Sequence, residues 1–216
     1  MTGAVVLLDL DDTLTDRART FEEWAVGFLR QLGRPVDELE ELRRLDNRGL
    51  TDRRAFFGAV AQRLGVTLDV EAVLSDYRAR TGHAYVAAGI VDALGRLRAS
   101  GGSSIVVTNG QSAVQRAKLD HTGLAKLVDR VVISEEVGVV KPDPRIFAIA
   151  LDGLADPADA WMVGDNLEAD ILGAARAGLS TAWVSNADPP PTSPIRPEIV
   201  CPTAALCIDE ILARPL

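Results

Sequence analysis

The chain has 216 residues and a formal net charge of −8, and 47% of its residues are hydrophobic. This length suits one domain, or one domain with a modest insert, and the acidic balance argues against nucleic acid or a membrane as a partner. No apolar stretch is long enough to span a bilayer, and Asp9 interrupts the N-terminal apolar run too early for a signal peptide. The two cysteines, Cys201 and Cys207, have no zinc or disulfide spacing, so a cytoplasmic location is expected.

The first predicted element is a buried strand that ends in an acidic cluster. Residues 4–8 form an unbroken apolar run, which predicts a strand buried on both faces, as in a parallel sheet. Three carboxylates follow within four positions, beginning with Asp9. Carboxylates at the end of a buried strand repel one another and lose solvation, so we expect a cation among them. A calcium loop is excluded, because its glycine and glutamate positions hold Leu14 and Thr20.

Residues 15–85 are expected to be wholly helical. Apolar residues recur at helical spacing in four segments, which are separated at Gly33, at the polar loop 46–49 and at Gly65. Seven of the ten aromatic residues lie in this stretch, and we expect them to fill the core of a small helical bundle. Because the stretch follows the acidic cluster directly, we interpret it as an insert that covers the strand ends.

From about residue 86 the pattern changes to alternating helices and strands. Helix ends are marked by residues such as Asp143, a favoured N-cap, and Gly178. This alternation predicts a parallel sheet with right-handed crossovers. Residues 187–197 are rich in proline and are expected to form a surface loop. The expected strands are 104–108, 130–133, 160–163, 181–184 and 199–200.

Polar clusters follow four of the predicted strands. The carboxyl ends of parallel strands meet at one edge of a sheet, where ligands bind, so we expect these clusters to come together. Carboxylates with room for water suit Mg²⁺, and a lysine suits the oxygens of a phosphate. The clusters are Asp9 and Asp11 after the first strand, Thr108 and Asn109 after the second, Lys141 beyond the third, and Asp165, Asn166 and Asp170 after the fourth.

These clusters resemble the four motifs of the haloacid dehalogenase-like (HAD) hydrolases, in the family's order. The matching stretches are Asp9-Leu10-Asp11-Asp12-Thr13, Thr108, Lys141-Pro142, and Gly164-Asp165 with Asp170. The resemblance covers the whole chain and implies an α/β fold, with a Rossmann-like parallel sheet flanked by helices. The core would be residues 1–14 and 86–216, and the inserted all-helical cap, residues 15–85, is similar to the family's C1 cap.

The resemblance implies a role for each acidic motif residue. Asp9 would be the nucleophile that forms an aspartyl-phosphate. Asp11 would protonate the leaving oxygen and then activate water. The expected Mg²⁺ ligands are Asp9, the main-chain carbonyl of Asp11, and Asp165. Asp170 is expected to support the site from outside, by orienting Lys141 or a metal-bound water.

The remaining motif residues are implied to bind the phosphoryl group. Thr108 would hydrogen-bond one of its oxygens, and Lys141 would neutralise both the nucleophile and the transferred group. Asn109 is assigned to phosphate binding as well, with a simple turn at the Asn-Gly pair as the alternative.

The acid at Asp11 favours phosphatase activity within the family, because a departing halide needs no proton. We therefore predict a Mg²⁺-dependent phosphatase acting on a small phosphorylated metabolite, as a monomer or homodimer. A phosphomutase or another HAD-type hydrolase such as a dehalogenase is the alternative, and a non-catalytic phospho-aspartate regulatory or binding module is another. Substrate choice is assigned to Arg48 and Arg53 of the helical insert, because arginine can hold a second anionic group; a solvated arginine face is the rival interpretation.

Overall fold

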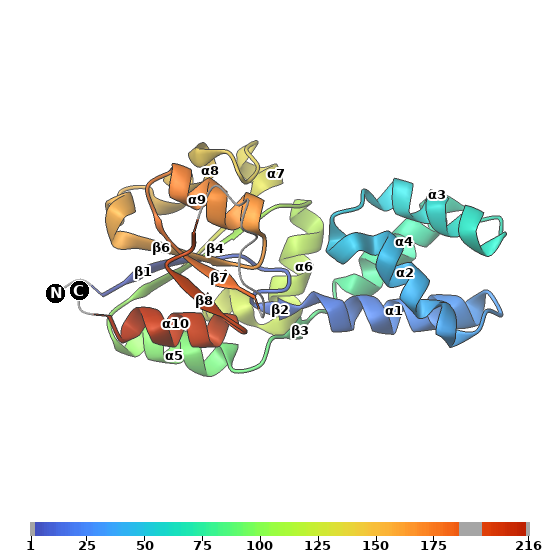
Figure 1. Cartoon of the computed structure of the whole chain (residues 1–216), viewed down its shortest axis with the longest axis horizontal. Coiled ribbons are helices and arrows are strands. Elements are labelled where there is room, and N and C mark those ends of the chain that lie inside the picture. Colours follow the sequence, from blue (N-terminus) through green and yellow to red (C-terminus); the bar gives the residue numbers. More distant parts are fainter. Residues whose placement is uncertain (1–2, 186–195, 215–216) are drawn as a thin grey trace. The chain divides into compact units, whose positions relative to one another are not determined.

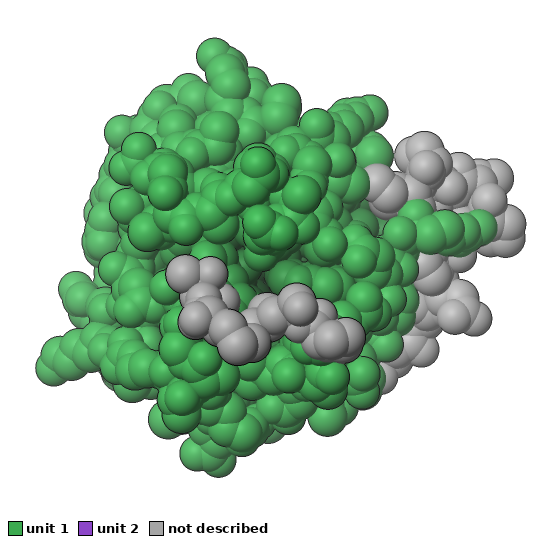
Figure 2. Space-filling model, turned by 90° about the vertical axis from the view of Figure 1, so that its left-hand side faces the viewer, with its two compact units in different colours: residues 1–16, 86–216 green, residues 17–85 purple. Residues whose placement is uncertain are grey.

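The computed structural model describes residues 3–185 and 196–214 (Figure 1). The chain divides into two compact units, one of residues 1–16 with 86–216 and one of residues 17–85, which we call the core unit and the helical unit. Figure 2 shows one face of the core unit in space-filling form. Within the described ranges, no helix is both long and apolar enough to cross a bilayer. Residues 187–195 of the expected proline-rich loop lie outside the described residues.

A six-stranded sheet forms the centre of the core unit, in the order β5-β4-β1-β6-β7-β8. Every neighbouring pair is parallel, which confirms the expected α/β sheet. The apolar run at the N-terminus becomes the third strand in this order, with neighbours on both sides. The strands are β1 (Val5–Leu8), β4 (Ser103–Thr108), β5 (Arg130–Ile133), β6 (Ala160–Gly164), β7 (Ser180–Val184) and β8 (Ile199–Cys201).

Helices cover both faces of this sheet (Figure 1). Because side chains alternate along a strand, Val6 and Leu8 of β1 pack into one hydrophobic cluster, and Val5 and Leu7 pack into another on the opposite face. The first cluster includes residues of α5 (Ile90–Ala99), α6 (Ser112–Thr122) and α10 (Ala204–Leu212). The second includes residues of α8 (Pro144–Leu151) and α9 (Gly173–Arg176).

The connection after β6 is not a single regular α-helix. A π-helical segment, Leu167–Leu172, comes first, and α9 follows it directly. The side chain of Asn166 caps the segment by accepting hydrogen bonds from the main chain of Glu168 and Ala169. The main-chain carbonyl of Asn166 also accepts hydrogen bonds from the main-chain N–H groups of Asp170 and Ile171. These residues lie four and five positions further along, and the longer bond widens the turn.

The helical unit is a bundle with an aromatic core, as the sequence predicts. Trp24 stacks on Phe28 with ring centroids 4.9 Å apart and meets Tyr77 edge-on at the same distance. Such contacts stabilise a small bundle beyond the burial of area alone. The helices are α1 (Arg17–Gln31), α2 (Leu39–Asp46), α3 (Arg53–Leu64) and α4 (Val70–Thr81), with 3-10 turns at Val36–Glu38 and Asn47–Gly49.

The ends of the predicted helical insert are extended instead of helical. The strands β2 (Thr15–Asp16) and β3 (Tyr85–Val86) form a separate two-stranded sheet. Thr15 donates both its main-chain N–H, at 2.8 Å, and its hydroxyl, at 3.0 Å, to the carbonyl of Leu10. These bonds hold Thr15 in a turn, so that α1 begins only at Arg17. The prediction of an entirely helical stretch from residue 15 is therefore wrong at its two ends.

Candidate active site

Asp9 comes directly after β1, at the carboxyl end of the sheet. Its main-chain N–H donates to the carbonyl of Val163 in β6 at 2.9 Å, so strand pairing fixes the backbone that carries its side chain. Asp9 is buried. Burial raises the pKa of Asp9 well above its ordinary value, and the charges of Asp170 and Asp165 add to this rise against the attraction of Lys141. This carboxylate therefore depends on nearby cations to remain charged.

The ammonium group of Lys141 lies at the centre of the site and is buried. It donates to Oδ1 of Asp9 at 2.5 Å, to Oδ1 of Asp170 at 2.6 Å and to the carbonyl of Val107 at 2.8 Å. These three acceptors use all three N–H groups of a lysine. Burial alone would lower the pKa of Lys141, but the carboxylates of Asp170 and Asp9 outweigh it and raise this pKa. Lys141 is therefore a fixed positive charge.

Three carboxylates meet beside this lysine. Asp9, Asp165 and Asp170 each place one oxygen within 4.8 Å of the others. When all three are ionised, their three negative charges and the positive charge of Lys141 leave a net charge of −2, which a divalent cation would balance. Oxygen ligands of this kind, with room for water, suit Mg²⁺. The residues present therefore fit the expected metal, and Asp170, which was expected only to support the site, lies close enough to take part.

Asp170 reaches the site because the residue at the end of β6 is a glycine. Its Oδ2 accepts a hydrogen bond from the main chain of Asn166 at 3.0 Å. A Cβ atom at Gly164 would lie 2.3 Å from that oxygen, far inside any normal contact distance. Glycine at position 164 therefore leaves the space in which the carboxylate of Asp170 turns towards Lys141.

Thr108 and Asn109 end β4 and begin the loop that follows it. The hydroxyl of Thr108 is buried and accepts an N–H from Gln115 at 2.6 Å. The side-chain amide of Asn109 exchanges two hydrogen bonds with the main chain of Lys141, donating to its carbonyl at 2.9 Å and accepting from its N–H at 2.8 Å. Asn109 thus ties this loop to the Lys141 loop, and its expected contact with phosphate stays a prediction.

The side chain of Asp11 lies beside a second buried lysine. Lys118 donates to its Oδ1 at 2.8 Å and to its Oδ2 at 2.7 Å. Gln115 adds a hydrogen bond to Oδ2 at 3.2 Å. Both carboxylate oxygens therefore have donors that hold the group in one orientation. The expected contact between a metal ion and the main-chain carbonyl of Asp11 stays a prediction.

Gln115 and Lys118 are the two polar residues of this site that the sequence analysis did not single out. Both lie on α6, and only 2% and 8% of them are exposed. The chain has three lysines, and of these only Lys126 is exposed. One signal was present in the sequence: Gln115 lies four positions before Leu119, so the two share the inward face of a helix. A polar residue on such a face needs a buried partner.

The polar loop 46–49 of the helical unit is built around a buried carboxylate. Arg17 donates to both oxygens of Asp46 at 2.8 Å, and Arg53 donates to one of them at 2.7 Å. Arg53 therefore has a partner inside its own unit, and its expected part in substrate selection stays a prediction. Arg48 is exposed and has a left-handed backbone, with a φ of 54°.

A parallel sheet with helices on both faces and a carboxylate–lysine site at its carboxyl edge defines an α/β enzyme of Rossmann-like architecture. The sequence agrees with a particular family of this class. Residues 4–178 match the profile of the haloacid dehalogenase-like hydrolases. The chain belongs to this family, as the resemblance of its four motifs implied, and it is a hydrolase.

Known relatives span the chain to different extents. Glyceraldehyde 3-phosphate phosphatase from Methanopyrus kandleri is 32% identical over 192 residues, which cover 83% of this chain and 82% of that protein. Pyrimidine 5'-nucleotidase YjjG from Escherichia coli is 50% identical over 82 residues, but these cover only 37% of this chain and 36% of the relative. The crystal structure of the HAD-hydrolase YfnB from Bacillus subtilis has a TM-score of 0.84 at 23% identity, covering 99% of this chain and 100% of that one. This last likeness concerns the fold alone.

Proposed function

We propose that the chain is a Mg²⁺-dependent phosphatase that hydrolyses a small phosphate monoester through an aspartyl-phosphate intermediate. The observation that carries this proposal is the buried ammonium of Lys141, 2.5 Å from Asp9 and 2.6 Å from Asp170. A fixed cation against a carboxylate suits a nucleophile that must approach a negatively charged phosphoryl group. The relatives named as a phosphatase and a nucleotidase support the same reaction class.

In the first step, a carboxylate oxygen of Asp9 attacks phosphorus, and the bond from phosphorus to the leaving oxygen breaks. Asp11, which must first take up a proton from solvent in exchange for a hydrogen bond from Lys118, gives that proton to the leaving oxygen, which departs as an alcohol. Thr108 donates a hydrogen bond to the phosphoryl group, and Lys141 offsets its negative charge. Mg²⁺ bound by Asp9, Asp165 and the main-chain carbonyl of Asp11 would supply further neutralisation of the phosphoryl oxygens.

In the second step, a water molecule gives a proton to Asp11, which is now ionised, and attacks phosphorus. The bond between phosphorus and Asp9 breaks, so that inorganic phosphate leaves and both carboxyl groups return to their starting forms. The hydrogen bonds that Lys118 and Gln115 donate to Asp11 suit the ionised form that accepts this proton.

Phosphate release from p-nitrophenyl phosphate tests the proposed function. We expect turnover in the presence of Mg²⁺, its loss after chelation with EDTA, and its return when excess Mg²⁺ is added, because the carboxylate cluster would otherwise carry uncompensated negative charge. Activity that survives complete chelation would contradict the role of the metal. A protein that releases no phosphate from this compound or from any member of a phosphorylated-metabolite panel would contradict the whole proposal.

We also propose that residues 15–85 act as a cap whose Arg48 takes part in choosing the substrate. Arg48 and Gly49 both have left-handed backbones, with φ values of 54° and 83°. Residues held in sparsely populated conformations cluster at functional sites. The buried carboxylate of Asp46 holds this turn by accepting from the main chain of Gly49 at 2.9 Å. Arginine at such a turn suits a carboxylate or second phosphate on the substrate.

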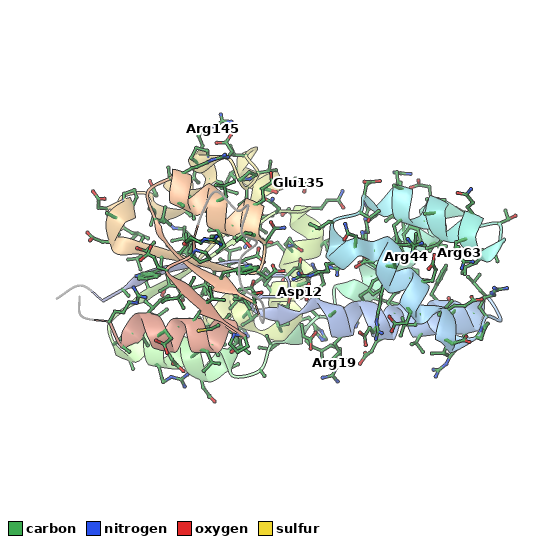
Figure 3. The ribbon with its side chains drawn as sticks, in the orientation of Figure 1. Asp12, Arg19, Arg44, Arg63, Glu135 and Arg145 are labelled. Carbon is green, nitrogen blue, oxygen red and sulfur yellow. The ribbon has the colours of Figure 1, made fainter. Side chains whose placement is uncertain are left out.

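Replacing Arg48 with Ala is expected to raise KM about tenfold for the best substrate of the metabolite panel, with little change for p-nitrophenyl phosphate. The reason is that only the former presents a second anionic group to the cap. Arg44→Ala, at an exposed arginine of the same unit (Figure 3), is the matched control and should leave both KM values unchanged. Equal losses on both substrates after Arg48→Ala, or none on either, would count against this role.

A further inference from the structure

Gln115 touches both the predicted acid and the predicted phosphate-binding hydroxyl. Its Nε2 lies 2.6 Å from Oγ1 of Thr108, 3.2 Å from the carbonyl oxygen of Asn109 and 3.2 Å from Oδ2 of Asp11. We propose that Gln115 is a positioning residue that directs the hydroxyl proton of Thr108 towards the phosphoryl group. This inference rests on the proposed phosphatase function, in which Thr108 binds a phosphoryl oxygen, and adds a residue to it.

The chemistry of the neighbours decides which end of the Gln115 amide faces them. A main-chain carbonyl such as that of Asn109, and a carboxylate such as that of Asp11, can only accept hydrogen bonds. An amide oxygen placed among them would face two partly buried acceptors at close range with no proton between them, which is costly. The amide nitrogen must therefore face this group, and one of its N–H groups is directed at the oxygen of Thr108.

A threonine hydroxyl that accepts a hydrogen bond keeps its own proton for another acceptor. In the described part of the chain, the only acceptor recorded for the hydroxyl of Thr108 is the carbonyl of Asn109, at 3.4 Å. That distance lies beyond the usual range of about 2.5–3.0 Å for O–H···O bonds. The proton of Thr108 can therefore be given to a phosphoryl oxygen. If a hydrogen-bond acceptor replaced the Gln115 amide, the Thr108 hydroxyl would donate its proton to that acceptor. The hydroxyl would then present only a lone pair to the phosphate.

Contacts at the start of α6 hold Gln115 in place. The main-chain N–H of Ser112 donates to Glu135 at 2.7 Å, and Figure 3 shows Glu135 among the labelled side chains of the core unit. One turn further, Arg116 pairs with Glu136 at 2.7 Å. Both glutamates belong to α7 (Ser134–Val137), so the two helices are joined on either side of the Gln115 position. The stretch of α6 that carries Gln115 is thus anchored by contacts within the protein.

The test compares Gln115→Met, Gln115→Glu, Thr108→Val and the double variant that combines Gln115→Met with Thr108→Val, in the full chain with Mg²⁺. Calorimetry measures the affinity for inorganic phosphate, and steady-state kinetics measure kcat/KM. Gln115→Met should lower both about tenfold, as expected for one misdirected hydrogen bond. Gln115→Glu should lower both further, because its carboxylate accepts the Thr108 proton. Added to Thr108→Val, Gln115→Met should cause no further loss of phosphate affinity, since no hydroxyl is left to direct.

Gln111→Met is the matched control, because Gln111 is exposed at the start of the same helix, and it should leave both quantities unchanged. Losses of phosphate affinity that multiply in the double variant, or unchanged phosphate affinity in Gln115→Glu, would overturn the inference. If Gln115→Met does not fold, the phosphate affinity of Gln115→Glu decides whether the inference holds. Wild-type protein that binds phosphate but hydrolyses no substrate contradicts the proposed function alone, because the phosphate affinities still test Gln115. Wild-type protein that binds no phosphate contradicts both.

Discussion

Replacing Lys141 with Met is expected to abolish phosphate release and to destabilise the protein by about 3–5 kcal/mol, the usual cost of removing one partner from a buried ion pair. The ammonium donates to Asp9, Asp170 and the carbonyl of Val107, and a thioether can donate to none of them. Two buried carboxylates would be left without their cation. Urea unfolding measures the loss of stability, and release of p-nitrophenol measures the loss of activity.

The matched control is Lys126→Met, which removes the one exposed lysine and should change the unfolding free energy by no more than about 0.5 kcal/mol.

The stability deficit of Lys141→Met, which is its loss of unfolding free energy relative to the wild type, should also depend on pH. Because burial raises the pKa of Asp9 well above its ordinary value, lowering the pH protonates Asp9 in the folded state before it does so in the unfolded state, and this lessens the need for a cation. The deficit should therefore shrink as the pH falls. An unfolding curve identical to that of the wild type would contradict the central place given to Lys141.

Replacing Asp9 with Asn is expected to lower kcat at least about a thousandfold while the protein stays folded. An amide of nearly the same shape cannot attack phosphorus, and it also removes one metal ligand. Folding should survive because the raised pKa of Asp9 shows that the folded state disfavours its charge, and the substitution removes that charge. Steady-state assays with excess Mg²⁺ measure the loss of turnover, and urea unfolding checks the fold.

Asp209→Asn is the matched control for this substitution. Asp209 forms a surface ion pair with Arg96 at 2.8 Å and is not part of the acidic cluster at the site. Its replacement should therefore leave kcat unchanged. Turnover by Asp9→Asn within a few fold of the wild type would show that Asp9 is not the nucleophile, and would leave a direct attack by water as the remaining route.

Most of the core fold could be predicted because its signals are local. The strands expected at 104–108 and 130–133 are found as β4 and β5, and Asp143 is the N-cap of α8. Parallel strands then place their carboxyl ends at one edge, which brings Asp9 and Asp165 together without knowledge of any contact. Pairing near Thr15 could not be predicted, because its bonds to Leu10 compete with helix formation over only two residues.

The parts of the site that escaped prediction depend on tertiary contacts. Gln115 and Lys118 follow the periodicity of an ordinary polar helix, and only the docking of α6 turns them towards Asp11 and Thr108. Asp46 is similar, because a carboxylate in a polar loop is normally solvated. Arginines from separate helices bury it instead, and their partner could not be found from sequence spacing.

The most direct test of the aspartyl-phosphate mechanism is a search for a phosphoryl group on Asp9. The wild-type protein is mixed with substrate and Mg²⁺, quenched in acid during turnover, digested and analysed by mass spectrometry. We expect the N-terminal peptide to carry the mass of one phosphoryl group at Asp9, and the same peptide of Asp9→Asn to carry none. A label found at another residue, or active protein that never carries one under conditions that preserve acyl phosphates, would contradict the aspartyl-phosphate mechanism.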